Sequence, residues 1–265
     1  MLINKYEIIS KISNGEFGEV LKVKHNDKFY ALKFGTKELI KYELSIYKQL
    51  KSCSNISTIY DVFEYNNTMH MVLDLYTMTL VDYKLRNYEN ANYFERCIAS
   101  VKELVLIIKT IHENNILHRD LKPTNICLDS NYKLFIIDFG IAKIYRHANI
   151  HNSQVKINGL IGSINFSSIN VINLIEPSRR DDIESLFYIF LYLLLSNENY
   201  KCYDSINTND KKNITSITYL MQHTLNIQNI DYELLNKLFN YIRRLKYNQE
   251  PKYDYIVQLL SKIIK

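Results

Sequence analysis

The chain has 265 residues, a formal net charge of +5 and 47% hydrophobic residues. This length allows one large domain or two smaller lobes around a substantial core. The charge is mild and no long basic run occurs, so ordinary surface lysines explain it better than a nucleic-acid-binding surface. The longest apolar run, residues 186–195, falls short of the ~20 apolar residues of a transmembrane helix, and it predicts a buried helix instead.

The four cysteines are scattered, and none forms a Cys-x-x-Cys pair. This spacing favours neither a zinc site nor a disulfide framework, and it fits a reducing compartment. Residues 1–5 lack the pattern of a signal peptide. We therefore expect an intracellular protein, cytoplasmic or nuclear, with no membrane contact.

Residues 1–75 predict a small sheet with one helix. Residues 37–51 carry Leu39, Ile46 and Leu50 at helical spacing. Asn26-Asp27 and Asn66-Asn67 separate neighbouring strands and predict tight turns. The predicted strands cover residues 6–12, 19–25, 28–34, 58–64 and 68–75.

Residues 76–265 predict a mainly helical region. Two short strands, 126–128 and 133–137, interrupt it at a Ser130-Asn131 turn. The predicted helices cover residues 98–112, 182–196, 231–246 and 252–264. The chain is therefore expected to be one α+β domain, residues 1–265, with a β-rich lobe at 1–75 and a helical lobe at 76–265. A cleft between two such lobes is a natural nucleotide site.

Two glycines stand between the first two predicted strands. Glycine lets the backbone approach phosphates closely and offer amide donors to them. The glycines alone could simply shape a hairpin, but the lysine-bearing strand that follows favours a phosphate-binding loop. The expected loop comprises Ile12, Ser13, Asn14, Gly15, Glu16, Phe17, Gly18, Glu19 and Val20.

Lys33 lies within the apolar segment Tyr30-Ala31-Leu32-Lys33-Phe34. A lysine in this setting is less easily explained as a surface residue. The segment resembles the third-strand motif of protein kinases, and this resemblance implies that Lys33 contacts the α- and β-phosphates of a nucleotide. Glu43, in the predicted helix 37–51, is the preferred partner for the ammonium group, and Glu38 is the competitor. A surface salt bridge is the alternative for either glutamate.

The segment His118-Arg119-Asp120-Leu121-Lys122-Pro123-Thr124-Asn125 is followed by Asp138-Phe139-Gly140. This arrangement supplies a base for a hydroxyl group and two oxygen ligands for magnesium. Asp120 is expected to accept the hydroxyl proton, and Lys122 to stabilise the transferred phosphoryl group. Asn125 and Asp138 are expected to hold Mg²⁺. Asp120 alone could be a helix cap or turn residue, but the complete set makes that interpretation untenable.

These segments, with those that follow them, resemble the casein kinase 1 family of Ser/Thr protein kinases. Most protein kinases carry Ala-Pro-Glu near the end of the activation segment, whereas this family carries Ser-Ile-Asn. The resemblance extends over essentially the whole chain. Its further segments are Gly162–Asn170, with Ser168-Ile169-Asn170, and Ser178–Leu186, Arg243–Tyr247 and Pro251–Tyr255.

The resemblance implies a two-lobed protein-kinase fold and transfer of phosphate from ATP to protein Ser or Thr hydroxyls. It implies a hinge at Asp74, Leu75 and Tyr76, behind Leu73, that meets the adenine edge. It also implies that Asp182 braces the catalytic loop. Members of the family generally act without phosphorylation of the activation loop, and we expect the same here.

Several residues depart from the family pattern. Asn165 stands where the family usually has an anion-binding Arg, and the basic stretch after the central helix is reduced to Lys211-Lys212. These changes put a preference for already phosphorylated substrates in doubt. The expected partners are protein substrates with Ser or Thr, acidic ones among them, and no nucleic acid. The expected state is a minimal catalytic module acting as a monomer.

Two other functions fit the chain less well. A pseudokinase that only binds partners typically lacks the equivalents of Lys33, Asp120 or Asp138, and all three are present. A small-molecule phosphotransferase of kinase-like fold usually lacks the Asp-Phe-Gly motif and the long segment from Asp138 to Asn170.

Overall fold

The computed structural model describes residues 1–15, 18–148, 150–196, 198 and 230–264. Two compact units form: Met1–Thr79 with Cys127–Ala142, and Leu80–Ile126 with Lys143–Lys265. The first unit is rich in strands and the second is mainly helical, as expected of an α+β chain. The segment Cys127–Ala142 belongs to the strand-rich unit by its contacts, although it follows two helices of the other unit in sequence.

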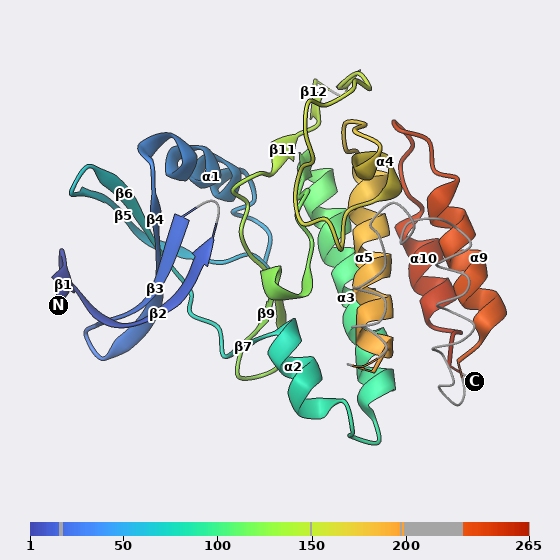
Figure 1. Ribbon diagram of the computed structural model, residues 1–265, viewed down its shortest axis with the longest axis horizontal. Coiled ribbons are helices and arrows are strands. Elements are labelled where there is room, and N and C mark those ends of the chain that lie inside the picture. The colour runs from blue at the N-terminus through green and yellow to red at the C-terminus, as the bar shows by residue number, and fades with distance from the viewer. Residues whose placement is uncertain (16–17, 149, 197, 199–229, 265) are drawn as a thin grey trace. The chain divides into compact units, whose positions relative to one another are not determined.

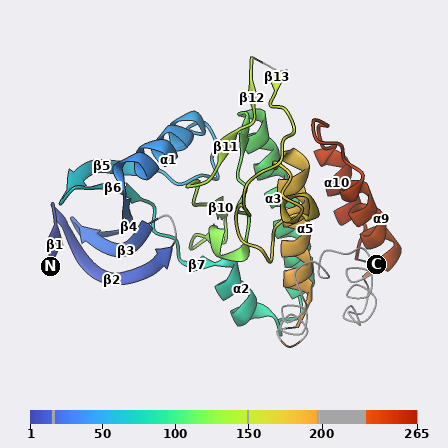
Figure 2. The ribbon, with the colours of Figure 1, turned by 45° about the horizontal axis from the view of Figure 1, so that its top comes forward.

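The first unit contains a six-stranded antiparallel sheet in the order β1-β2-β3-β4-β6-β5. Helix α1 (Lys37–Gln49) packs against β4 and β6, and Figure 2 shows it beside the curved sheet. The strands are β1 (Leu2–Ile3), β2 (Tyr6–Gly15), β3 (Gly18–His25), β4 (Lys28–Gly35), β5 (Ile59–Tyr65) and β6 (Thr68–Leu73).

The two predicted tight turns are confirmed. Asn26 and Asp27 join β3 to β4 with φ angles of 48° and 60°, and Asn66 and Asn67 join β5 to β6 with φ angles of 47° and 60°. Two consecutive left-handed residues match the twist of a hairpin, and Asn and Asp tolerate this conformation better than most residues.

The core of this unit forms because alternate side chains of the strands point to one face of the sheet. The ring of Tyr6 stacks on Phe63 at 5.8 Å. Helix α1 begins at the cap Thr36, whose hydroxyl accepts from the Leu39 amide. The buried cluster consists of Ile3, Tyr6, Leu21, Val23, Leu32 and Val72.

A second, three-stranded sheet has the order β10-β9-β7. Its strands are β7 (Met78–Thr79), β9 (Ile126–Leu128) and β10 (Leu134–Ile136). Strands β9 and β10 confirm the two short strands predicted in this region. The chain leaves β10 directly toward Asp138, so this small sheet sets the start of the segment that carries that carboxylate.

The helices of the second unit form a packed group. Helix α3 contacts α5 and α10, and α9 contacts α5 and α10; Figure 1 shows these four helices running beside one another. The helices are α2 (Leu80–Asn87), α3 (Tyr93–Glu113), α4 (Ile169–Ile172), α5 (Arg179–Leu194), α9 (Tyr232–Arg243) and α10 (Tyr253–Leu260). The short elements are β8 (Ile116–Leu117), η1 (Pro123–Asn125), β11 (Lys143–Ile144), β12 (Arg146–His147) and β13 (Ile150–His151).

Helix α5 is buried along its whole length except at Arg180, as the apolar run predicted. It begins at Arg179, three residues before the predicted start at 182, because Ser178 and Asp181 form a capping box at its N-terminus. Among the described residues, no helix combines the length and the apolarity needed to cross a membrane.

Candidate active site

The expected phosphate-binding loop, residues 12–20, comprises the end of β2 and the start of β3 with the two residues between them, and Gly15 pairs with Gly18. Gly18 has a φ of 134°, and a Cβ there would lie 2.4 Å from the Phe34 carbonyl oxygen. This position therefore requires glycine. Glu16 and Phe17 lie outside the described residues. Of the other expected loop residues, Ile12 and Ser13 are exposed, and Glu19 and Val20 are partly exposed.

In the first unit, two carboxylates contact the Lys33 ammonium. Its Nζ lies 2.7 Å from Glu43 Oε2 and 2.7 Å from Asp138 Oδ1. Strand β4 supplies the lysine, α1 the glutamate, and the segment after β10 the aspartate. Glu38 is exposed, so the structure pairs Lys33 with the glutamate that the sequence preferred.

Glu43 also fixes the start of the Asp-Phe-Gly segment, because its Oε1 accepts a hydrogen bond of 3.1 Å from the Phe139 amide. The Phe139 ring is fully buried and meets the Tyr47 ring at 5.2 Å. Asp138 has a φ of 66°, a sparsely populated conformation for a non-glycine residue. The Glu43 bond and the packing of Phe139 hold the backbone in that conformation.

Burial and the neighbouring carboxylates have opposite effects on the pKa of Lys33. Burial alone would lower the pKa of the ammonium, but the nearby carboxylates of Glu43 and Asp138 outweigh it and raise the pKa of Lys33. Burial raises the pKa of Glu43, and the attraction of Lys33 offsets only part of that effect. Lys33 therefore stays positively charged at neutral pH, as a phosphate-binding group must.

The side chains of the expected hinge residues Asp74 and Tyr76 make hydrogen bonds to other residues of the first unit. Asp74 Oδ2 accepts from the Thr58 amide at 2.7 Å and Oδ1 from the Tyr60 hydroxyl at 2.8 Å. The Tyr76 hydroxyl lies 3.0 Å from the Ser57 hydroxyl. These bonds anchor the segment after β6, so any contact of this segment with a base would come from its backbone.

In the second unit, the Asp120 carboxylate is held on both oxygens. Oδ1 accepts from the Ser163 amide at 2.8 Å; Oδ2 accepts from Lys122 Nζ at 2.7 Å and Asn125 Nδ2 at 3.1 Å. The Asn125 amide also donates to the Asp120 carbonyl at 2.9 Å. Three of the residues that the sequence assigned to catalysis are therefore in direct contact, and Ser163 joins them.

The loop that carries Asp120 is braced by Asp182 of α5. The buried Asp182 carboxylate accepts from the His118 amide at 2.9 Å, the Arg119 amide at 3.0 Å and His112 Nε2 at 2.9 Å. His112 Nδ1 lies 2.7 Å from the Tyr253 hydroxyl. Burial would raise the pKa of Asp182, but the hydrogen bonds that its carboxylate accepts, above all the one from His112, outweigh burial and lower the pKa.

His112 and Tyr253 were not singled out from the sequence. His112 lies in the last turn of α3 and is buried with the apolar residues of that helix. A histidine at the end of a helical apolar stripe was the available signal. Burial is the main cause that lowers the pKa of His112, and the bond to Asp182 partly opposes it. The neutral ring then donates to Asp182 and accepts from the Tyr253 hydroxyl.

An acidic residue, Glu176, was also not singled out from the sequence. The Glu176 carboxylate, buried to 6% exposure, lies 3.6 Å from the Arg119 guanidinium and 2.8 Å from Lys143 Nζ. It connects the catalytic loop, β11 and the segment before α5. The sequence signal was an acidic residue just before Pro177 and Ser178, the N-cap residue of α5. That signal is too weak to assign a role to Glu176.

Asn125 and Asp138 have the ligand chemistry that a hard divalent cation needs. Asn125 Nδ2 makes both bonds to Asp120, so the amide oxygen faces away from that carboxylate. The Asp138 side chain is 28% exposed, so its carboxylate is not sealed inside the protein. Amide and carboxylate oxygens are the ligands that Mg²⁺ takes from proteins, so each of these two side chains has the chemistry of such a ligand.

Comparison with known proteins agrees with this chemistry. The family model described as the protein kinase domain matches residues 6–264. The chain is 31% identical over 277 residues to a probable casein kinase I homolog of Encephalitozoon cuniculi (strain GB-M1), covering 98% of this chain and 85% of that protein. It is also 28% and 27% identical to casein kinase I homologs 2 and 3 of Schizosaccharomyces pombe (strain 972 / ATCC 24843). These matches cover 98% of this chain but 62% of each S. pombe protein.

Proposed function

Since the chain belongs to the protein kinase domain family, we propose that it is a Ser/Thr protein kinase of the casein kinase 1 type. It transfers the γ-phosphoryl group of ATP to protein hydroxyls. The observation that carries this proposal is the state of Asp120, whose buried carboxylate is held by Lys122, Asn125 and Ser163. A catalytic base needs this kind of fixed position.

In this reaction, the substrate hydroxyl oxygen forms a bond to the γ-phosphorus, and the bond from that phosphorus to the β–γ bridging oxygen breaks. ADP leaves with the electron pair. Asp120 orients the hydroxyl and takes its proton, and the Lys122 ammonium balances charge on the transferred group. Lys122 contacts Asp120 at 2.7 Å, so base and cation act at one position.

The first unit supplies the nucleotide-binding groups. Lys33, kept charged by Glu43 and Asp138, pairs with the α- and β-phosphates, and backbone amides at the end of β2 and the start of β3 bind phosphate oxygens. The segment at Asp74–Tyr76 contacts the adenine edge through its backbone.

This family uses ATP with a divalent metal, and the metal proposed here is Mg²⁺. When bound, the ion neutralises charge on the phosphate oxygens. Asp138 and Asn125 would provide oxygen ligands to that ion. The Asp138 carboxylate also contacts Lys33, the proposed nucleotide-binding lysine, at 2.7 Å.

The substrates of this family are proteins. We propose that this chain acts as a monomer inside the cell, binds neither nucleic acid nor membranes, and needs no phosphorylation of its activation segment. Glu176 supports the last point, because its carboxylate already pairs with Arg119 and Lys143, the cations that a phosphate on that segment would otherwise seek.

The test is the initial rate of phosphate transfer from ATP to casein by wild type and Asp120→Asn. Base catalysis typically contributes ~10²–10⁴-fold, so we expect a loss of about 100-fold or more with unchanged circular dichroism. The matched control is Asp254→Asn, because the Asp254 side chain is 85% exposed and its variant should transfer phosphate like wild type. Transfer by Asp120→Asn at the wild-type rate would refute the assignment.

A further inference from the structure

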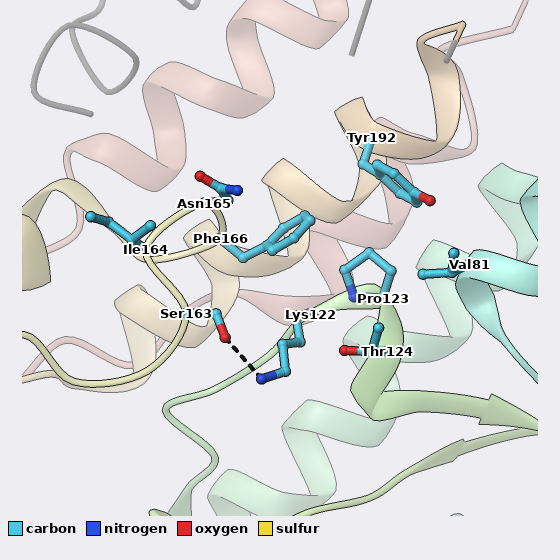
Figure 3. A pocket seen from close by; sticks show the side chains of 9 residues that line it. All are labelled: Val81, Lys122, Pro123, Thr124, Ser163, Ile164, Asn165, Phe166 and Tyr192. Carbon is cyan, nitrogen blue, oxygen red and sulfur yellow. Dashed lines mark hydrogen bonds between the residues drawn. The ribbon is translucent and has the colours of Figure 1, made fainter. Parts of the chain in front are cut away.

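A cavity of about 360 Å³ lies next to Lys122 within the second unit. Its walls come from four places in the sequence: α2, residues 122–124, residues 163–166 and α5. Figure 3 shows Phe166 with its ring directed toward Pro123 and Tyr192, and Lys122 directed toward Ser163. The volume equals that of roughly a dozen waters at ~30 Å³ each, enough for one large side chain.

The cavity is lined mainly by apolar and aromatic groups. Val81, Pro123, Phe166 and Tyr192 contribute hydrocarbon surface, and the rings of Phe166 and Tyr192 meet edge to face at 6.1 Å. The Lys84 ammonium lies 4.0 Å from the centre of the Tyr192 ring and donates to the Tyr192 carbonyl at 2.7 Å. These contacts hold the aromatic wall in place before any ligand arrives.

Among the residues that the structure describes, the lining of this cavity offers no spare positive charge. Lys122 is the one charged residue of that described lining. Its Nζ lies 2.7 Å from Asp120 Oδ2 and 2.9 Å from Ser163 Oγ, so the catalytic carboxylate neutralises it. Asn165 contributes an uncharged amide. A phosphate or carboxylate placed here would lose water without gaining a counter-ion from the described part of the chain, which is unfavourable.

We propose that this cavity binds an uncharged apolar or aromatic side chain of the protein substrate, close in sequence to the Ser or Thr that receives the phosphate. The inference rests on the proposed function, because it takes Asp120 to mark the position of the acceptor hydroxyl. Lys122 both lines the cavity and contacts Asp120. An extended peptide advances ~3.3 Å per residue, so a side chain within a few residues of the acceptor reaches the cavity.

The first experiment measures kcat/KM on a peptide set built on one sequence. Each position within three residues of the acceptor serine carries Leu, Phe, Ala, Asp, phosphoserine or Lys in turn. Removing one methylene from a hydrophobic pocket costs ~10- to 200-fold. At one position we therefore expect Leu or Phe to exceed Ala by about tenfold, and the charged residues to fall below Ala.

Two variants assign that preference to the cavity. Val81→Asp puts a carboxylate into the wall of the cavity. At the peptide position where wild type prefers Leu or Phe, this variant should give a higher kcat/KM with the Lys peptide than with the Leu peptide. Asn165→Arg puts a cation into the wall and should raise the kcat/KM of the Asp and phosphoserine peptides relative to the Leu peptide. Leu85→Asp is the matched control, since Leu85 is on the same helix and 60% exposed and does not line the cavity. It should keep the wild-type order.

The outcomes separate the two proposals. Equal kcat/KM for all peptides, or a wild-type order retained by Val81→Asp and Asn165→Arg, overturns the cavity proposal and leaves the kinase activity standing. A preference of wild type for phosphoserine or Asp at every position also overturns it. If wild type phosphorylates no peptide, the proposed function fails, and the cavity assignment fails with it.

Discussion

The ion pair between Lys33 and Glu43 gives the sharpest stability prediction. Glu43→Gln keeps an oxygen that can accept from the Phe139 amide but removes the charge that faces Lys33 at 2.7 Å. Removing one partner of a buried ion pair costs ~3–5 kcal/mol. The cost here should be lower, because Asp138 still lies 2.7 Å from the ammonium and because burial already disfavours the charged form of Glu43.

What remains is the loss of one charge-assisted hydrogen bond, worth ~1.5–3 kcal/mol. We therefore expect Glu43→Gln to lower the free energy of unfolding by about 2 kcal/mol. For a chain of this size that corresponds to a fall in Tm of roughly 4–8 °C. The variant should also bind ATP more weakly, because the Lys33 side chain loses one of the two carboxylates that position it.

The assay is urea unfolding followed by circular dichroism, together with calorimetric titration of ATP. Glu38→Gln is the matched control, because it makes the same chemical change in the same helix at an exposed position. Exposed substitutions usually change stability by less than ~0.5 kcal/mol. Equal unfolding midpoints for the two variants would refute the reasoning.

Two further predictions concern the support of the catalytic loop. Gly162 has a φ of 78°, and a Cβ there would lie 2.4 Å from the Arg119 carbonyl oxygen, so Gly162→Ala should lower the free energy of unfolding by at least ~1–3 kcal/mol and slow phosphate transfer. The control Gly159→Ala, which has nothing within 4 Å of the added Cβ, should lower it by less than ~0.5 kcal/mol. Equal unfolding midpoints for the two variants would contradict this prediction. Burial holds the pKa of His112 below its ordinary 6.5, so the unfolded chain takes up the proton first as the pH falls. The free energy of unfolding should therefore decrease below pH 6.5, by at most ~1.4 kcal/mol per pH unit. His112→Gln should reduce this dependence on pH in unfolding curves between pH 7 and 5, and an unchanged dependence would contradict the role given to His112.

The residues that lie close together in sequence were the predictable part of the site. Asp120, Lys122 and Asn125 fall within one short loop, and local backbone geometry alone brings them near one another. The asparagine turns were predictable for the same reason, because two left-handed residues favour Asn and Asp whatever the rest of the chain does.

The supporting contacts depend on packing across long stretches of chain. His112 meets Tyr253 across a separation of 141 residues, and neither residue carries a motif. Glu176 reaches Arg119 and Lys143 only because the segment before α5 folds back to them. The start of α5 at Arg179 was missed because its cap was not read from Ser178 and Asp181, although both are visible in the sequence.

A labelled γ-phosphate shows whether this chain transfers phosphate from ATP to Ser or Thr. Wild type and Asp120→Asn are incubated with magnesium, γ-labelled ATP and a protein mixture, and the label on each amino acid is counted. We expect label on Ser and Thr with wild type, little on Tyr, and a loss of about 100-fold or more with Asp120→Asn. Nucleotide binding without any labelled residue would contradict it and would indicate a binding module instead.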